Sequence, residues 1–528
     1  MEFAIAQCLK TYAGGLGYLA GSHMRSAYDL RQNLVGIGIL WKFGYYDQVR
    51  RSDNGMEVLF QEKHYSFLEE TGVMVPVYVN KHQVYVRAYY LAPEVFGTCP
   101  MYFLSTDIPE NDFLARTITH KLYDADTAAR IAQSIVLGLG GIKVLEQVAP
   151  ETELYHMNEA HALPLVFHLY EKFRDVAEVK KRVVFTTHTP EKAGNEEHPI
   201  TLLEKMSFFG NLSFDEARQV SREYGNNFNH TLVALRLSGS ANAVSRLHGE
   251  ISRKMWKDYP DICSITNITN AQNLHFWADN ALRHALDSGH DVLLRDRKRH
   301  LKKRLIEQVA NQTGKLFDEG AIIVVWARRF AEYKRATLLM HDIVRFQQLL
   351  SRKSEKLQVI WAGKPYPNDT AAISVFNHLV ELTRSLPNAA VLTPYELELS
   401  RLLKTGSDVW LNTPRRPHEA SGTSGMSASM NGTLNLSIQD GWVCEFARHG
   451  HNSFVLPVVD ALQPIEHQDE QDCKNLLTML DEEVLPLYYR QPDRWFDMMK
   501  TAMREIAPAF DSNRMADEYY QLYEGKSV

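Results

Sequence analysis

The chain has 528 residues, of which 45% are hydrophobic and 23% are charged, which is typical of a globular protein. Its formal net charge of −6 argues against a general nucleic-acid binder and against a protein that binds anionic membranes. Because no apolar run is long enough to cross a bilayer and no signal-peptide pattern is present, we expect no membrane association. Five scattered cysteines without metal-ligand spacing predict reduced thiols, a cytoplasmic protein and no metal site.

The N-terminal half opens with a glycine-rich turn. Gly14, Gly15 and Leu16 lie at the start of a predicted helix, and residues 34–40 are continuously apolar, which is typical of a short buried parallel strand. Alternating apolar and polar residues between 58 and 104 predict a β-rich insertion. After this insertion we expect alternating helices and short strands.

Two of these short strands end in polar residues. Residues 154–157 lead to Glu159 and His161, and residues 182–187 lead to His188. Open α/β sheets bind their ligands at the carboxyl ends of the strands, so these side chains are candidates for a binding site. Each of them could equally be an ordinary buried polar residue.

The C-terminal half repeats the α/β pattern after a charged helix predicted at 286–312. A solvated helix face explains the basic run at 295–304 better than a nucleic-acid site, because no aromatic residues are interleaved with it. The buried strand at 321–326 is followed by a predicted helix over the motif that ends in Lys334 and Arg335.

Three basic residues of this motif are candidates for binding phosphate. Arg328, Arg329 and Lys334 follow a strand end, where guanidinium groups can bind phosphate oxygens in pairs and an ammonium group adds a point charge. A solvated basic surface is the alternative.

Residues 419–425 contain only Gly, Ser, Thr, Ala and one Glu, so their backbone N–H groups are open to a ligand. A helix is predicted from Met426, and its N-terminus would favour a phosphate or a sugar with many hydroxyl groups. Glu419 would either cap backbone N–H groups or accept hydrogen bonds from sugar hydroxyls. With few acid–base pairs in view, such a site would act by positioning and electrostatics.

The patterns predict three regions: a Rossmann-like domain at 1–285, a second at 286–480, and helices at 481–528 that pack back on the first domain. The expected fold class is α/β, with parallel sheets on either side of a cleft.

Several long motifs occur in one order along the chain. They are Thr11-Tyr-Ala-Gly-Gly-Leu-Gly-Tyr-Leu-Ala-Gly, Phe185-Thr-Thr-His-Thr-Pro, Arg328-Arg-Phe-Ala-Glu-Tyr-Lys-Arg, Trp361-Ala-Gly-Lys and the stretch from Asp408 to Met426. Together they resemble the α-glucan (glycogen, starch and maltodextrin) phosphorylases, in particular the short bacterial type, over nearly the whole chain. The resemblance implies the GT-B fold and retaining transfer of glucose between an α-1,4-glucan and phosphate.

The resemblance also implies roles for individual residues. His188, Arg329, Lys334 and Glu419 are the catalytic candidates. The phosphate or donor would contact Gly14, Gly15, Leu16, Arg328, Arg329, Lys334, Thr423 and Gly425. The sugar would contact Asn270, Glu419, Ser421, Gly422 and, on a gating loop, Asp126. The partners would be an α-1,4-glucan or maltodextrin and phosphate, and the family is often dimeric, so a homodimer is compatible with the resemblance.

One departure concerns the cofactor. The phosphorylases hold pyridoxal phosphate (PLP) on a lysine that follows Gly-Met, and this chain has Ser427 there, which cannot form an imine. Three readings follow: a phosphorylase-like transferase that holds PLP noncovalently, a PLP-independent transferase that uses a nucleoside diphosphate sugar, and a non-catalytic glucan-binding relative. The turn at Asn270 also departs from the family's pattern.

Overall fold

The computed structural model describes residues 1–525, and the chain forms two compact units. The first consists of Met1–Tyr45, Phe60–Asn270 and Met515–Val528, and the second of Tyr46–Leu59 and Ala271–Arg514. The boundaries of these units differ from the predicted domain boundaries. Residues 271–285 and 481–514 belong to the second unit. The α/β class with parallel sheets is confirmed.

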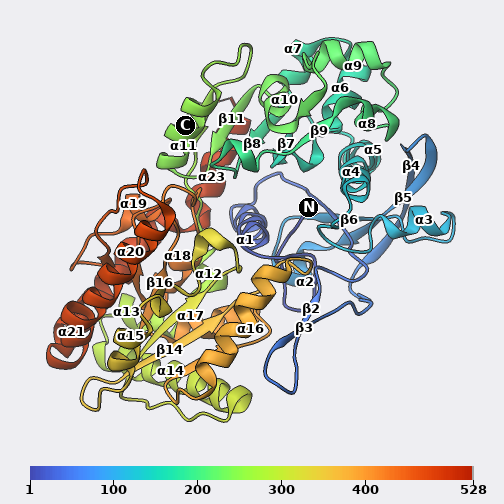
Figure 1. Cartoon of the computed structure of the whole chain (residues 1–528). Helices are drawn as coiled ribbons and strands as arrows, with labels where there is room; N and C mark the ends of the chain where they lie inside the picture. The colour runs from blue at the N-terminus through green and yellow to red at the C-terminus, as the bar shows by residue number, and fades with distance from the viewer. Residues whose placement is uncertain (526–528) are drawn as a thin grey trace. The chain divides into compact units, whose positions relative to one another are not determined.

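The first unit contains two four-stranded sheets. One has the order β1-β6-β5-β4, and the other, with all its strands parallel, has the order β12-β11-β8-β7 (Figure 1). Their bounds are β1 Gly36–Ile39, β4 Glu69–Val79, β5 His82–Leu91, β6 Met101–Ser105, β7 Tyr155–Asn158, β8 Val183–Thr186, β11 Ser240–Ala243 and β12 Ile265–Asn267. The strands predicted between 58 and 104 therefore extend the sheet of β1 through the parallel β1–β6 pair.

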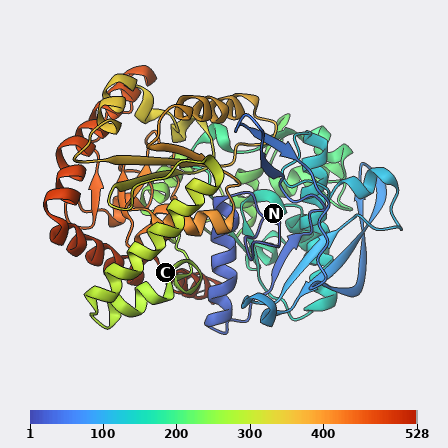
Figure 2. The ribbon, with the colours of Figure 1, turned by 90° about the horizontal axis from the view of Figure 1, so that it is seen from below.

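The helices of the first unit pack beside these strands (Figure 2), while alternate residues of β4 stay exposed. Their bounds are α1 Gly15–Asp29, α2 Pro93–Phe96, α3 Phe113–Thr117, α4 Thr127–Ile135, α5 Gly141–Val148, α6 Leu165–Phe173, α7 Val176–Lys180, α8 Ile200–Lys205, α9 Phe214–Ser221, α10 His230–Leu237 and α11 Arg246–Trp256. A short hairpin of β9 Glu197–Pro199 and β10 Asn227–Asn229 lies beside them. The apolar faces of β4–β6 and β7–β8 pack against α4, α5 and α6 in one hydrophobic core.

One helical segment of the described chain, Thr127–Val148, is long and apolar enough to cross a membrane by composition. In its most apolar window 78% of the residues are buried inside the protein, as in the core helix of a soluble protein. The segment joins α4 and α5 through a π-helical turn at Val136–Gly140.

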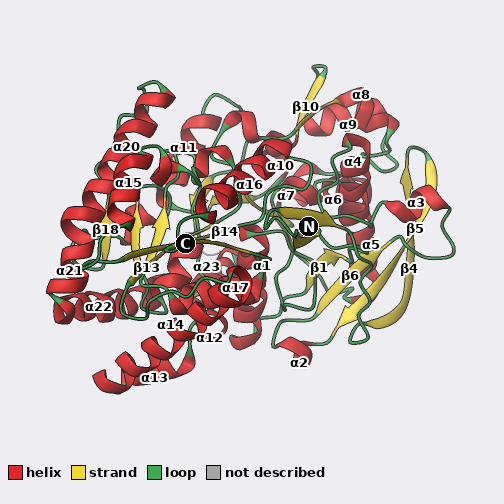
Figure 3. Ribbon diagram, turned by 60° about the horizontal axis from the view of Figure 1, so that its bottom comes forward, coloured by secondary structure: helices red, strands yellow, loops and turns green. Residues whose placement is uncertain are grey.

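The second unit is built on a six-stranded parallel sheet with the order β15-β14-β13-β16-β17-β18 (Figure 3). Its strands are β13 Ile322–Ala327, β14 Leu357–Ala362, β15 Ala389–Leu392, β16 Val409–Asn412, β17 Leu434–Ser437 and β18 Ser453–Val455. Every residue of these strands is buried, as expected of a parallel sheet covered on both faces. The strand order reverses between β13 and β16, and ligands bind at the carboxyl ends of strands at such a switch point.

Helices and a hairpin complete the second unit. Its helices are α12 Leu274–Trp277, α13 Asn280–Asp287, α14 Asp291–Thr313, α15 Ile343–Leu350, α16 Thr370–Arg384, α17 Leu397–Gly406, α18 Ser424–Ser429, α19 Val443–Phe446, α20 Ile465–Met479, α21 Leu485–Arg490, α22 Pro492–Phe510 and the start of α23 Ser512–Tyr523. The hairpin is β2 Asp47–Arg50 with β3 Met56–Leu59.

The basic run on α14 is only partly solvated. Arg299 is exposed, as predicted, and Arg295 is half-buried, but the prediction is wrong for Lys298 and Lys302, which are buried. Lys298 Nζ donates to the carbonyls of Thr405 and Asn431, while Lys302 Nζ lies 2.7 Å from Asp408 Oδ2. The two lysines thus attach α14 to the residues that precede β13, β16 and β17.

Breaking the Lys302–Asp408 ion pair should destabilise the second unit. Asp408→Ala leaves a buried ammonium without its carboxylate, and we expect a loss of about 3–5 kcal/mol of unfolding free energy in urea titrations. The matched control is Asp493→Ala, which removes the exposed partner of Arg295 and should cost about 0–1 kcal/mol. Equal losses in the two variants would contradict this assignment.

Candidate active site

The switch point of the second unit carries a cluster of three charged side chains. Arg328 directly follows β13, and Glu419 lies in the loop after β16. Glu419 Oε2 lies 2.6 Å from Arg328 Nη2 and 3.1 Å from Lys334 Nζ. Only 11% of the Glu419 side chain is exposed, so this is a largely buried ion triad.

The triad fixes the charge of Glu419. Burial by itself would raise the pKa of this carboxyl group, but the positive charges of Arg328 and Lys334 outweigh it and lower the pKa from an ordinary 4.5 to about 2. Glu419 is therefore a carboxylate at every physiological pH, and its oxygens accept hydrogen bonds but do not donate them.

Arg328 keeps one donor free. Its Nη1 atom is buried and has no hydrogen-bond partner in the described structure. A cavity of about 10 Å³ lies beside it, lined by Glu419, Ser421, Gly422 and Trp442 among others. This space holds about one water-sized group, so a single oxygen atom of a ligand fits beside the free N–H.

Two glycines are required in the loop before α18 and at the start of that helix, one by its backbone angle and the other by close packing. Gly422 has φ +78°, which disfavours any side chain. A Cβ atom on Gly425 would overlap the side chain of Asn435. The carbonyl of Ser421 accepts a hydrogen bond from the Trp442 N–H at 3.0 Å. Thr423 is the residue before α18, and its side chain does not cap the helix.

Ser427 does not fit the role of a cofactor lysine. It is fully buried on α18, and its hydroxyl lies 3.2 Å from the carbonyl of Ser424 and 3.4 Å from that of Thr423, so it bonds to its own helix. The serine side chain has no amine.

Asp440 belongs to the site but was not predicted. It follows β17 and accepts hydrogen bonds from the N–H groups of Glu419 and Gly441, both at 2.9 Å. Burial raises the pKa of Asp440 to about 7. The sequence could have indicated Asp440, because it lies three residues beyond a parallel strand and is followed directly by glycine.

The predicted helix after β13 is wrong. Arg328 to Arg335 form a loop with one 3₁₀ turn at Glu332–Lys334, and the next α-helix begins only at Ile343. This loop curves Lys334 back toward Glu419, while Arg329 is exposed to solvent. An α-helix would have carried Lys334 away from the switch point.

In the first unit, polar residues gather at the ends of β7 and β8. His188 Nε2 lies 2.5 Å from Asn158 Oδ1, and the His188 backbone N–H donates to Glu159 Oε1 at 2.6 Å. Burial lowers the pKa of His188 to about 3, so the ring is neutral. Because an amide oxygen only accepts, Nε2 carries the proton and Nδ1 keeps its lone pair.

Glu159 holds these two strand ends together in a constrained conformation. Its φ is +65°, which non-glycine residues rarely adopt, and burial raises the pKa of its carboxyl group to about 7. His161 is also buried, and burial lowers its pKa to about 3. Backbone strain of this kind concentrates at functional sites.

Gly14 and Gly15 start α1, and the space around the position of a Cβ atom is open at both. The carboxylate of Glu2 accepts the N–H groups of Ala13 at 2.6 Å and Gly14 at 3.1 Å. Leu16 is half-buried on the first turn. Glu2 was not predicted, and nothing in its sequence context marks it.

Asn270 and Asp126 have different environments. Asn270 is buried, and its Oδ1 atom has no hydrogen-bond partner among the described residues, so it can accept a hydroxyl group. Asp126 is exposed, and its carboxylate accepts the Ala129 N–H at 2.8 Å as the N-cap of α4. Asp126 thus has a structural role in capping that helix.

Comparison with known proteins identifies the family. Residues 266–456 match the family described as carbohydrate phosphorylase. The chain is 33% identical to the maltodextrin phosphorylase of Thermococcus litoralis, over 100% of this chain and 70% of the relative.

The chain belongs to the carbohydrate phosphorylase family.

Two further relatives are similar over nearly the whole chain. The glycogen phosphorylase of Aquifex aeolicus is 30% identical over 99% of this chain and 85% of its own length. An uncharacterised protein of Methanocaldococcus jannaschii is 49% identical over 98% of this chain and 97% of its own. The predicted family and the predicted class of enzyme, a glycosyltransferase of the phosphorylase type, are confirmed. Within the described residues, no cluster of side chains has the composition of a metal site.

Replacing Glu419 by glutamine should destabilise this phosphorylase-family protein in a pH-dependent way. The folded-state pKa of about 2 lies below the ordinary 4.5, so the carboxylate stabilises the fold above pH 4.5 and loses this effect as the pH falls toward 2. We expect Glu419→Gln to cost about 3 kcal/mol at pH 7 in urea titrations, with a difference at least 1 kcal/mol smaller at pH 3.5.

The matched control is Glu381→Gln, which removes an exposed partner of Arg384. It should change the unfolding free energy by less than about 1 kcal/mol at either pH. A cost for Glu419→Gln that does not vary with pH would show that the ion triad is not the cause.

Proposed function

We propose that this protein transfers glucose between an α-1,4-glucan and phosphate, as a phosphorylase-type transferase without covalently bound PLP. The observation that carries this proposal is the unpaired, buried Nη1 of Arg328 beside the Glu419 carboxylate. A buried guanidinium N–H without a partner is costly, and an anionic oxygen would satisfy it. The relatives named above are maltodextrin and glycogen phosphorylases, which supports the choice of glucan and phosphate.

In this proposal, the basic residues bind the phosphate. Arg328 provides its free N–H, and Lys334 provides a partly buried ammonium group that Glu419 holds in place. Arg329 is exposed and can add a second guanidinium group. Fixed positive charge stabilises the negative charge on a transferring phosphate, and it does so without reorganisation during the reaction.

In this proposal, the carboxylate of Glu419 also binds the sugar. Its oxygens only accept hydrogen bonds, so they can hold glucose hydroxyl groups, together with the backbone of Ser421 and Gly422. In the first unit, Asn270 Oδ1 is a free acceptor for a hydroxyl group, and neutral His188 keeps an uncharged ring for contact with the sugar. The Gly14–Gly15 turn leaves backbone open for the phosphate, and Asp126 is assigned to its helix cap.

The cofactor proposal follows from Ser427. PLP bound to a lysine would supply a phosphate group near the substrate, but Ser427 offers no amine and bonds to its own helix. We therefore propose that PLP, where it binds at all, binds without a covalent link.

A nucleoside diphosphate sugar is the second candidate donor. The same observation favours it, because a diphosphate can fill the free position at Arg328 and interact with Lys334 without any cofactor. Binding only to the folded state raises the unfolding temperature, so a screen of ADP-, UDP- and GDP-sugars distinguishes this donor from glucose 1-phosphate. A non-catalytic, glucan-binding protein would bind maltodextrin without turnover.

Covalent PLP should be absent. We expect the protein, incubated with PLP and reduced with borohydride, to carry no pyridoxyl group on peptides containing residue 427. The matched control is Ser427→Lys, which returns an amine to this position. A purified wild-type protein with one equivalent of PLP that survives gel filtration and reduction would overturn the proposal.

Lys334 should be required for glucose transfer but not for glucan binding. We expect Lys334→Ala to lower the rate of glucose 1-phosphate formation by at least about 100-fold, because it removes a positive charge at the phosphate. Binding of maltodextrin should change little. Lys356→Ala is the control, since Lys356 pairs with Asp318 at an exposed site. Unchanged activity in Lys334→Ala would show that the phosphate does not bind there.

A cytoplasmic location and a homodimer are further proposals. The described cysteines are all free thiols, among them Cys99 and Cys473 in the interior, which suits a reducing compartment.

A further inference from the structure

The loops that carry Lys334 and Glu419 contain a second cluster of charged side chains, which they share with α20. The cluster consists of Arg335, Arg415, Asp469 and Asp472, and we call it the Arg–Asp cluster. At most 22% of any of these side chains is exposed. Because buried charges are costly unless they are paired, these four side chains stabilise one another only in this arrangement.

Arg335 joins α20 to the loop that follows β16. Its Nη1 atom lies 2.8 Å from Asp469 Oδ1, and its Nη2 atom lies 2.8 Å from Asp472 Oδ2. Its Nε and Nη2 atoms also donate to the carbonyls of Thr413 and Pro414, at 3.0 Å each. One guanidinium group thus attaches the loop after β16 to α20.

The carboxylate of Asp469 bridges two loops. Besides the bond from Arg335, it accepts hydrogen bonds from Arg415 Nη2 at 2.9 Å on Oδ1 and 2.8 Å on Oδ2. Arg335 directly follows Lys334 in the loop after β13. Arg415 precedes Glu419 in the loop after β16. A single carboxylate therefore ties together the two loops that supply the cation and the anion of the closest part of the site.

The two loops also contact each other directly. The Arg415 N–H donates to the carbonyl of Tyr333 at 2.7 Å. Thr413 Oγ1 donates to the carbonyl of Lys334 at 2.9 Å. Between these contacts, Arg335 has φ +49°, which residues other than glycine rarely adopt. Such a conformation persists only where the surrounding contacts hold it, and the Arg–Asp cluster provides them.

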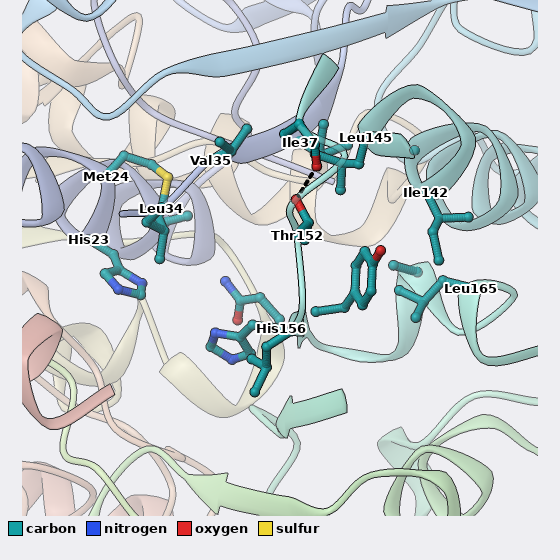
Figure 4. Close-up of a pocket in the computed structure, with 18 of the residues that line it drawn as sticks. His23, Met24, Leu34, Val35, Ile37, Ile142, Leu145, Thr152, His156 and Leu165 are labelled. Atoms are coloured by element: carbon teal, nitrogen blue, oxygen red, sulfur yellow. Dashed lines mark hydrogen bonds between the residues drawn. The ribbon is translucent and has the colours of Figure 1, made fainter. Parts of the chain in front are cut away.

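The Arg–Asp cluster is not placed to bind a ligand itself. Among the described residues that line the cavity beside Arg328, none belongs to the cluster. The same holds for a cavity of about 430 Å³ in the first unit, whose wall includes His23 and His156 (Figure 4). The cluster can therefore act on the candidate site only through the loops that it connects.

We propose that Asp469 is a positioning residue for phosphate binding. It holds the loops after β13 and β16 together through its two arginine partners, so the Lys334 ammonium group remains beside the Glu419 carboxylate. Without the Asp469 carboxylate, Arg415 would lose its nearest counter-charge, and two buried guanidinium groups would repel each other. The link to phosphate rests on the proposed function, whereas the effect on the position of Lys334 does not.

The test compares Asp469→Asn with two controls in the full chain. Asp469→Asn keeps the size of the side chain and removes its charge. Glu470→Gln changes the next residue of α20, an exposed carboxylate whose described ion pair is with His467 at 3.9 Å. Asp408→Ala breaks the buried ion pair with Lys302, so it reports the effect of lost stability in the second unit alone.

The first measurement is the rate at which acetic anhydride modifies the Lys334 amine, followed by mass spectrometry of the peptides. We expect Asp469→Asn to raise this rate at least about fivefold, because the loops separate and the amine leaves its ion pair with Glu419. The two controls should raise it less than about twofold. An unchanged rate in Asp469→Asn, or an equal rise in Asp408→Ala, would overturn the proposal.

The second measurement is the steady-state kinetics of phosphorolysis. We expect Asp469→Asn to raise the KM for phosphate at least about fivefold and to leave the KM for maltodextrin within about twofold. A smaller fraction of folded enzyme would lower kcat and leave both KM values unchanged, and this result would overturn the proposal. If the wild-type protein shows no phosphorolysis, the proposed function fails, and the labelling of Lys334 alone decides the positioning role of Asp469.

Arg415→Gln tests the same bridge from the other loop, should Asp469→Asn not fold. It leaves Arg335 paired with both Asp469 and Asp472, so no buried guanidinium group loses its carboxylate. We expect it to raise the labelling rate of Lys334 at least about threefold. An unchanged labelling rate in a folded Arg415→Gln variant would overturn the proposal.

Discussion

The buried Glu419 carboxylate is the interaction on which the candidate site of the second unit depends. It lies between Arg328, which directly follows β13, and Lys334, which belongs to a 3₁₀ turn and lies close to the same sheet edge. Without this negative charge, two positive side chains would be buried together without a counter-charge, which is strongly unfavourable. The triad therefore keeps the basic loop closed on the sheet and leaves one guanidinium N–H directed at a small cavity.

In the first unit, the buried polar residues at the strand ends do not form a charged triad. Buried His188 is uncharged, and Glu159 holds the end of β8 through the His188 backbone N–H. The result is a polar strand end with fixed donors and acceptors and no net positive charge. Such a surface suits sugar hydroxyl groups, whereas the charged triad of the second unit suits an anion. This difference between the units is the physical reason for assigning sugar and phosphate contacts as we do.

Much of the fold was predictable because the parallel strands are short, continuous and apolar. The sequence marked β13, β14 and β16 correctly, and it also marked the small residues of the loop that contains Gly422, whose φ requires glycine. It could not show that Glu419 pairs with Arg328, because 91 residues separate them and only the sheet brings them together.

Other features were missed for identifiable reasons. The motif after β13 has the composition of a helix, but the ion pair between Lys334 and Glu419 favours a loop there. The burial of Lys298 and Lys302 depends on which face of α14 meets the sheet, and the charge pattern alone does not reveal it. Glu2 contacts the turn at Gly14, which is 12 residues away in the sequence, and no local motif marks this contact.

Because we propose that PLP is not covalently bound, the chemistry must be established directly on the purified protein. The most direct measurement is ³¹P NMR of purified protein incubated with maltodextrin and inorganic phosphate, with and without added PLP. Our account predicts that the phosphate signal declines while the signal of α-glucose 1-phosphate grows. An unchanged phosphate signal, with active glucosyl transfer from a nucleotide sugar in the same preparation, would contradict it.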